Sequence, residues 1–277
     1  MFCSAQVGLM KEMVPGFFNL RQIKKNMGGR SDPDALKTVL YQEIERYNKL
    51  IGVLTSTLGD CGKAVLGFVV VTPALEAVMN SLLDFTVPTV WHCAYPSAKN
   101  LSNWLRDMGL RIIQMKGWIE KELPKVFWLA GFTYPTGFLT ALLQTTARKN
   151  GIAIDTLTWE FPIINEKEED VKVPAKEGAY ISGLYLEGAR WKSEGACLTE
   201  PLPMELTSPM PLVWFKPTDG KKKTGKNNYA CPTYMYPVRT GSRERPSYVI
   251  TVDLKCGSAN AEFWTKRGVA LLLSTAT

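Results

Sequence analysis

The segment of the chain that most resembles a chemical motif is the lysine-rich stretch at residues 220–227, GKKKTGKN. It nearly matches the phosphate-binding loop G-x-x-x-x-G-K-[ST], but its last position is Asn227, which lacks the hydroxyl that such loops place on Mg²⁺. A phosphate loop must also open a helix, whose free N–H groups hold the anion. The segment that follows, NYACPTYMYPV, has a strand pattern with a proline. We therefore interpret the stretch as a solvated loop between two strands and expect no nucleotide cofactor.

Other reactive residue types do not assemble into a recognisable set. His92 is the only histidine, and no carboxylate lies near it in the sequence, so we expect a structural or surface role for it. The acidic residues of the segment 166–170 form a run, which is typical of a solvated face. The six cysteines are far apart and form no C-x-x-C pair, which favours reduced thiols over a metal or disulfide framework. We expect no catalytic set, no cofactor and no metal site.

Composition narrows the classes of partner. The 277 residues can bury a core as one domain or two, and 45% of them are hydrophobic, as in ordinary globular proteins. The formal net charge is +7, but Lys and Arg are spread along the sequence instead of clustering as in a nucleic-acid reader. The longest apolar runs, 64–71 and 269–273, are too short to span a bilayer, and the N-terminus has no secretory pattern. We therefore expect neither a nucleic-acid nor a membrane partner.

The first half of the sequence shows helical periodicity. A sustained apolar stripe predicts a long helix at about residues 34–59, and Thr72 with Pro73 predicts the start of a second helix that ends before Pro88. A third helix is predicted at about residues 98–123. The fourth begins at Pro135, carries cations in its last turn and ends at Asn150-Gly151.

Beyond Gly151 the hydrophobic period changes to two. Leu157, Trp159 and Phe161 alternate with polar residues, as in a strand with one buried face. Six strands are predicted, at about residues 157–163, 178–191, 212–216, 229–238, 248–254 and 263–273. Short strands separated by Gly- and Pro-rich turns are typical of small barrels and sandwiches.

The sequence therefore predicts an α+β protein of two parts. Residues 1–151 are expected to form an N-terminal helical subdomain, in which residues 1–35 are an adapter segment with a short helix near residues 19–26. Residues 152–277 are expected to form a small six-stranded antiparallel β-barrel.

Several ordered segments resemble one known family. They are VLYQEIERYN (39–48), AYPS (94–97), the run 127–150, LEGARW (186–191) and RGVALLL (267–273). From about residue 36 to the end, the sequence resembles the C-terminal domain of dynein heavy chains. LEGARW and RGVALLL are more similar to axonemal than to cytoplasmic heavy chains, and residues 247–254 are similar to the outer-arm gamma type. Lys192 departs from the pattern, because the family often has Asp at this position.

The resemblance implies a role inside a large motor. Dynein heavy chains hydrolyse ATP in a ring of AAA+ modules and walk on microtubules, and the C-terminal domain lies across one face of that ring. The resemblance implies a structural and regulatory domain that tunes ATP-driven motility and has no catalysis of its own. The expected partners are the AAA+ ring modules of the same heavy chain, and other dynein subunits and the microtubule only through the parent heavy chain. The expected location is the axoneme of a cilium or flagellum.

Within this picture, one helix face is a hypothetical docking surface. On the predicted helix at 34–59 we expect ring contacts around four residues: Glu43, Arg46, Tyr47 and Lys49. Two alternatives stay open at the level of sequence. The protein could be a stand-alone adaptor or nucleic-acid module that uses a barrel face and the loop from Lys221 to Lys226, or a hydrolase that uses the Trp-rich barrel as a pocket.

Overall fold

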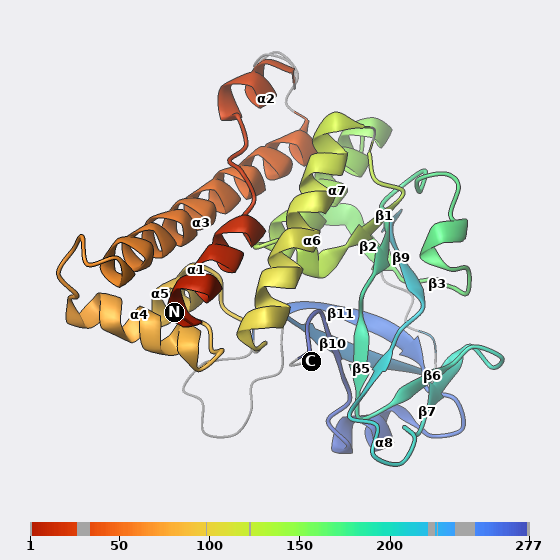
Figure 1. The fold of residues 1–277 in the computed structure, drawn as a ribbon. Helices are drawn as coiled ribbons and strands as arrows, with labels where there is room; N and C mark the ends of the chain where they lie inside the picture. The colour runs from red at the N-terminus through yellow and green to blue at the C-terminus, as the bar shows by residue number, and fades with distance from the viewer. Residues whose placement is uncertain are drawn as a thin grey trace. The chain divides into compact units, whose positions relative to one another are not determined.

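The computed structural model describes residues 2–26, 34–97, 99–121, 123–220, 225, 227–235 and 247–275 (Figure 1). Its contacts divide the protein into two compact units. The first contains Leu40–Glu120 and the N-terminal segment, and the second contains Lys121–Thr275 together with Asp34–Val39. The division predicted at residue 151 stays a prediction. No helix among the described residues is both long and apolar enough to cross a membrane.

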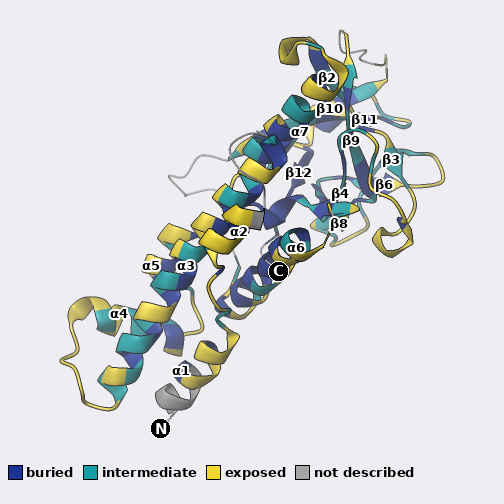
Figure 2. Ribbon diagram, turned by 90° about the horizontal axis from the view of Figure 1, so that it is seen from above, coloured by how far each residue is buried: buried dark blue, intermediate teal, exposed yellow. Residues whose placement is uncertain are grey.

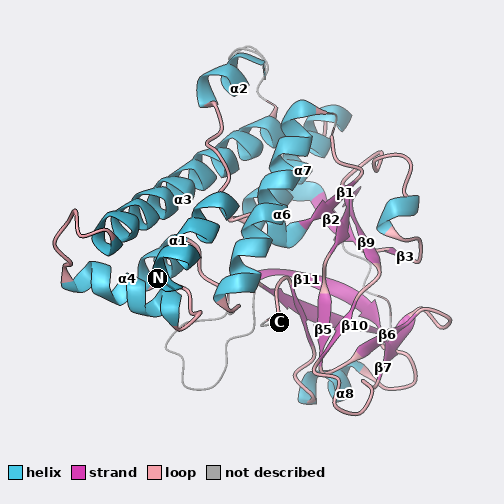
Figure 3. Ribbon diagram, viewed as in Figure 1, coloured by secondary structure: helices cyan, strands magenta, loops and turns pink. Residues whose placement is uncertain are grey.

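The first unit is built of helices (Figure 3). They are α1 (Phe2–Met13), α2 (Leu20–Asn26), α3 (Ala35–Val65), α4 (Pro73–Leu83), α5 (Thr89–Ala94) and α6 (Leu101–Glu120). The long helix and the two predicted after it are present, and Thr72 caps α4 by accepting a hydrogen bond from Leu75 N at 3.3 Å. Two helices were not predicted: α1 lies in the expected adapter segment, and α5 lies between the second and third predicted helices.

The core of the first unit forms where the α3 stripe meets bulky aromatic residues. Ile44, Leu54 and Leu58 on α3 are fully buried. The rings of Trp91 and Trp104 stack with their centroids 6.0 Å apart. Trp91 Nε1 donates a hydrogen bond to Thr57 Oγ1 on α3 at 2.8 Å, and Trp104 Nε1 donates to Tyr95 O at 3.1 Å. Both indole N–H groups therefore keep a partner inside the core, as buried donors require.

The second unit combines short strands with two helices, α7 (Pro135–Asn150) and α8 (Ala261–Lys266). Its strands are β1 (Val126–Trp128), β2 (Leu157–Glu160), β3 (Ile163–Ile164), β4 (Ala179–Ser182), β5 (Tyr185–Glu187), β6 (Arg190–Lys192), β7 (Cys197–Thr199), β8 (Thr207–Pro209), β9 (Leu212–Asp219), β10 (Asn228–Tyr234), β11 (Tyr248–Lys255) and β12 (Ala270–Leu272). As predicted, α7 starts at Pro135 and ends at Gly151, which adopts the left-handed conformation with φ 65°.

The predicted six-stranded antiparallel β-barrel is wrong. The described strands form three open sheets: one of order β1-β4-β9-β2 with β3 also paired to β9, one of order β11-β10-β12-β5-β8, and the hairpin β6-β7. The pairs β1-β4 and β10-β12 are parallel. A barrel requires every strand to pair on both sides, whereas β2 and β11 are terminal strands in the described sheets.

Glycine and a helix cap explain the departure from a barrel. The predicted strand at 178–191 breaks at Gly183 (φ 72°) and Gly188 (φ 76°) into β4, β5 and β6, which join three different sheets. A Cβ at Gly183 would lie 2.3 Å from the Trp128 ring, so only glycine fits there. The predicted strand at 263–273 begins instead as α8, because Asn260 caps that helix through its side chain, and leaves only β12 as strand.

Two clusters of aromatic side chains lie in the core of the second unit. Phe132 and Phe138 stack with centroids 4.3 Å apart, and Phe127 lies 4.8 Å from Phe138. All three are at most 2% exposed. A second cluster joins Phe161 to Phe215 in an edge contact at 5.1 Å. The first cluster joins β1 to α7, and the second joins β9 to the segment that follows β2.

Candidate functional site

The four docking residues predicted on α3 divide between the core and the surface. Glu43 and Tyr47 are buried, with 0% and 1% exposure, whereas Arg46 and Lys49 are exposed. Arg46 Nη1 donates to Glu43 Oε1 at 2.8 Å, so Arg46 also neutralises a buried carboxylate. Only Arg46 and Lys49 can offer their side chains to a partner without rearrangement. Docking through this helix stays a prediction.

Glu43 and Tyr47 belong to a buried polar cluster in the first unit. Tyr47 is hydrogen-bonded to Arg111 of α6, whose guanidinium carbon lies 4.4 Å from the centre of the Tyr95 ring. Burial raises the pKa of Tyr47, although the charge of Arg111 acts in the opposite direction. Burial disfavours the charged form of Arg111, yet Tyr95 and Tyr47 hold its pKa above the usual value. Arg111 therefore stays charged, and the cluster joins α3 to α6.

Sequence reasoning missed the acid and the arginine that α6 contributes. Asp107 is 4% exposed and forms an ion pair with Lys99 at 2.7 Å. Arg111 is 2% exposed. The sequence did contain a signal of their burial. Asp107, Arg111 and Met115 follow one another at intervals of four residues and therefore share one side of the helix. Met115 is fully buried, which places the two charged residues on a buried face.

An apolar surface lies between α3 and α4 in the first unit. Leu66, Phe68 and Val70 are 66%, 75% and 88% exposed. Figure 2 shows the loop before α4 as exposed. A pocket of about 400 Å³ continues this surface, and it is lined mainly by Val69, Val70, Ala74, Leu75, Val78 and Val90. Clustered exposed apolar residues of this kind mark interaction sites.

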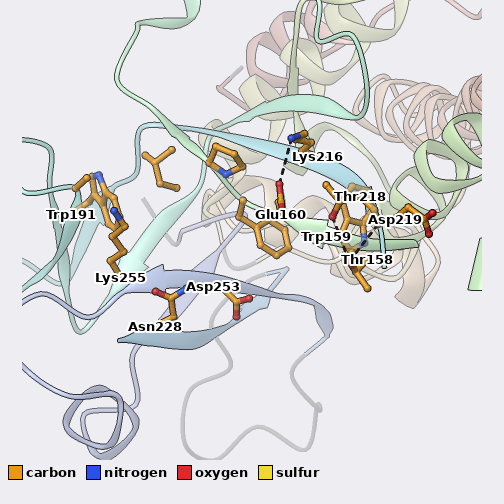
Figure 4. Close-up of a pocket in the computed structure, with 14 residues that line it drawn as sticks. Thr158, Trp159, Glu160, Trp191, Lys216, Thr218, Asp219, Asn228, Asp253 and Lys255 are labelled. Atoms are coloured by element: carbon orange, nitrogen blue, oxygen red, sulfur yellow. Dashed lines mark hydrogen bonds and ion pairs between the residues drawn. The ribbon is translucent and has the colours of Figure 1, made fainter. Parts of the chain in front are cut away.

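A polar groove of about 620 Å³ lies within the second unit (Figure 4). One wall is a face of the β2-β9 pair, where Thr158 opposes Thr218 and Glu160 opposes Lys216. The other wall is a face of the β10-β11 pair, where Asn228 opposes Lys255. Directly opposed residues point to the same side of a sheet. Two sheet faces that would usually form an apolar interior are therefore polar here and line a groove.

Aromatic rings and a buried donor complete the groove. Trp159 and Phe161 line it with ring centroids 6.5 Å apart, and Trp191 of β6 lies at the end near Lys255 (Figure 4). Trp191 is 7% exposed, and its Nε1 has no hydrogen-bond acceptor in the part of the protein that the structure describes. An unsatisfied buried N–H is destabilising by about 1–3 kcal/mol.

The remaining residues singled out from the sequence have simple environments. His92 is half-buried on α5. The acidic run at 166–170 is exposed, as expected of a solvated face, and the adjacent Val171 is buried. Lys221, Lys222, Lys223 and Lys226 of the lysine-rich loop lie outside the described residues. In the described ranges, no group of three His, Cys, Asp or Glu residues is placed to hold a metal ion.

Comparison with known proteins gives a consistent match. The family model of the C-terminal domain of dynein heavy chains matches residues 3–273. The dynein-1-beta heavy chain of the flagellar inner arm I1 complex of Chlamydomonas reinhardtii is 51% identical over 266 residues, and mouse dynein axonemal heavy chain 2 is 43% identical over the same length. Both alignments cover 96% of this protein and 6% of the relative. Mouse dynein axonemal heavy chain 1 is 40% identical over 264 residues, which are 94% of this protein and 6% of the relative.

Proposed function

Because the protein belongs to the family of C-terminal domains of dynein heavy chains, we propose that it is a structural and regulatory domain that docks on the AAA+ ring of its own heavy chain. The family match over residues 3–273 carries this proposal. The sequence spans about 6% of the length of its curated relatives. ATP hydrolysis and microtubule binding would therefore reside in other parts of the heavy chain, and this domain would tune them.

The names of the relatives support an axonemal location. One is a flagellar inner-arm heavy chain and two are axonemal heavy chains. The sequence had indicated the axonemal type and an axoneme of a cilium or flagellum. The similarity to the outer-arm gamma type stays a prediction, since the relative with 51% identity is named for an inner-arm complex.

Two surfaces of the first unit suit docking. The apolar surface around Phe68 and Val70 would be covered by a neighbouring module, because large exposed apolar clusters favour burial in an interface. The exposed Arg46 and Lys49 on α3 would add charge complementarity, which affects orientation and association more than affinity. A docked domain shifts the ring between conformations only by its differential affinity for them.

The experiment changes each surface in the full-length heavy chain. Arg46 is unsuitable for charge reversal, because the change would leave Glu43 buried beside a second carboxylate. Lys49→Glu and Val70→Asp alter exposed side chains and should preserve the fold. We expect both variants to change microtubule gliding velocity or processivity, with Val70→Asp having the larger effect.

The matched control is Lys116→Glu on α6, which makes the same charge change at another exposed lysine of the first unit. It should move at the parent velocity. If Lys49→Glu and Val70→Asp both left velocity, processivity and ATPase rate unchanged, docking through these surfaces would be refuted.

A further inference from the structure

The polar groove of the second unit is distinct from the docking surfaces of the first, and its charges are arranged unevenly. Glu160 and Lys216 face each other at 3.4 Å and neutralise one another in its middle. Asp219 and Lys255 are exposed, and neither has an ion-pair partner in the described part of the protein. Figure 4 shows Asp219 and Lys255 toward opposite ends of the groove, with Lys255 beside Trp191. One end therefore offers a carboxylate, and the other offers an ammonium group, beside which the indole N–H of Trp191 is buried without an acceptor among the described residues.

We propose that this groove binds an extended peptide segment that presents an acidic side chain at the Lys255 end and a basic side chain at the Asp219 end. The side chain of Lys255 would pair with the acid, and a peptide carbonyl would accept the hydrogen bond of Trp191 Nε1 once the segment displaces the groups that cover it. Trp159 and Phe161 add apolar atoms to the lining of the groove.

The polar lining suits an extended backbone. Thr158 and Thr218 on the β2-β9 wall carry hydroxyls, and Asn228 on the β10-β11 wall carries an amide. These groups can hydrogen-bond to the N–H and C=O groups of a peptide, while Lys255 and Asp219 meet its charged side chains.

The charged residues that line the groove argue against the binding of a nucleotide or another polyphosphate there. The groove is lined by three carboxylates, Glu160, Asp219 and Asp253, and by two lysines. Clustered phosphates would meet this excess of negative charge, whereas a peptide with one charge of each sign meets complementary groups. The groove also offers aromatic rings and hydroxyls, which suit side chains and amides.

The test uses the 277-residue protein labelled with ¹⁵N and three blocked pentapeptides that differ only at their ends. The sequences are acetyl-ETVTK-amide with mixed charge, acetyl-ETVTE-amide with two acids, and acetyl-KTVTK-amide with two bases. The Trp191 indole N–H signal, assigned by its absence in Trp191→Phe, is followed during titration. We expect the mixed peptide to shift this signal and to bind about tenfold more tightly than the other two.

Variants then test the orientation. Lys255→Glu should transfer the preference to the doubly basic peptide, and Asp219→Lys should transfer it to the doubly acidic one. Trp191→Phe removes the N–H and keeps a ring, and its titration is followed through the indole signal of Trp159, which also lines the groove. It should weaken the mixed peptide about threefold, as expected from the loss of one hydrogen bond. Lys192→Glu is the matched control, since Lys192 neighbours Trp191 in β6 but does not line the groove. It should leave all three affinities unchanged.

Several outcomes would overturn the proposal. One is the absence of any shift of the Trp191 signal with all three peptides at millimolar concentration. Another is a preference that Lys255→Glu and Asp219→Lys leave unaltered. Shifts produced by ATP but not by the peptides would assign the groove to anions instead.

Discussion

The two units differ in where they place their charged side chains. The first unit buries Glu43, Asp107 and Arg111, each at most 4% exposed. The buried polar residues of the second unit, within the described residues, carry hydroxyls, as do Ser182, Ser208 and Thr233. Its charged residues instead line an open groove. Buried charges require partners in fixed positions and are therefore committed to the fold, whereas groove charges remain accessible to a ligand.

The difference follows from the elements available to each unit. Long helices such as α3 and α6 present side chains from several turns to the same interior, so Tyr47 of α3 and Arg111 of α6 can form a hydrogen bond there. Strands of three or four residues expose alternate side chains on two faces and supply few neighbours to any one polar group. We therefore expect substitutions of the buried charged residues to affect stability in the first unit, and substitutions of the groove charges to affect binding in the second.

The largest expected effect comes from Arg111→Ala. The substitution removes the cation that contacts Tyr47 and Tyr95 and leaves Asp107 with one fewer favourable charge nearby. Breaking such a buried cluster should lower the free energy of unfolding by about 3–5 kcal/mol. Urea denaturation followed by circular dichroism measures the change. Arg106→Ala, at an exposed position of the same helix, should remain within about 0.5 kcal/mol of the parent. If Arg111→Ala lowered the free energy of unfolding by less than about 1 kcal/mol, the buried charges of the first unit would not be committed to the fold, and the contrast between the two units would be wrong.

A second, intermediate effect should appear at alkaline pH in both units. Burial raises the pKa of Tyr47 above its ordinary value of 10.0 and that of the Cys231 thiol above 9.0. Because each group releases its proton more readily in the unfolded state, its contribution to stability is complete below the ordinary pKa and is lost as the pH rises above it. Thermal unfolding measured from pH 8 to 11 should therefore show a falling melting temperature.

Single substitutions separate the two contributions to this pH dependence. Cys231→Ala should flatten the decline between pH 9 and 10, and Tyr47→Phe should flatten it above pH 10. Both variants are compared by slope, because each also lowers stability at neutral pH through lost packing or a lost hydrogen bond. If the slopes of both variants equalled that of the parent, Tyr47 and Cys231 would be less shielded from water than the structure indicates.

Helices were predicted from the sequence more successfully than strand topology. The caps of α4 and α7 are local signals, since Thr72, Pro135 and Gly151 act on their own neighbours. The assignment of β4, β5 and β6 to three sheets depends on Gly183 and Gly188, whose backbone conformation is set by distant contacts such as that of Gly183 with Trp128. Periodicity of two shows that a segment is extended, but it does not show which strand it pairs with.

The docking residues show the same limit at the level of single side chains. Tyr47, named from the sequence as a docking residue, is 1% exposed. Glu43 is buried although it is charged, and it has Arg46 Nη1 at 2.8 Å and Tyr47 within electrostatic range. A carboxylate on an otherwise charged helix face therefore gave no local sign of burial. The groove was not predicted either, because its two walls come from strands that are far apart in the sequence.

The smallest expected effects are those of helix caps, which should be similar in the two units. Thr72 accepts a hydrogen bond from Leu75 N at 3.3 Å at the start of α4, and Asn260 accepts one from Phe263 N at 2.9 Å at the start of α8. Replacing either residue by Ala should lower stability by about 1 kcal/mol. Thr72→Ser and Asn260→Asp retain the acceptor and should stay close to the parent.

The two caps also sharpen the comparison, because α8 has only six residues and depends on its buried Trp264, whose Nε1 donates to Cys256 O at 3.0 Å. A short helix loses a larger fraction of its hydrogen bonds when its first turn frays. Asn260→Ala should therefore increase hydrogen exchange throughout α8 and at β12, whereas Thr72→Ala should affect only the first turn of α4. Equal and purely local exchange in both variants would mean that α8 is held by its packing alone, and that its cap plays no part in ending β11 and starting β12.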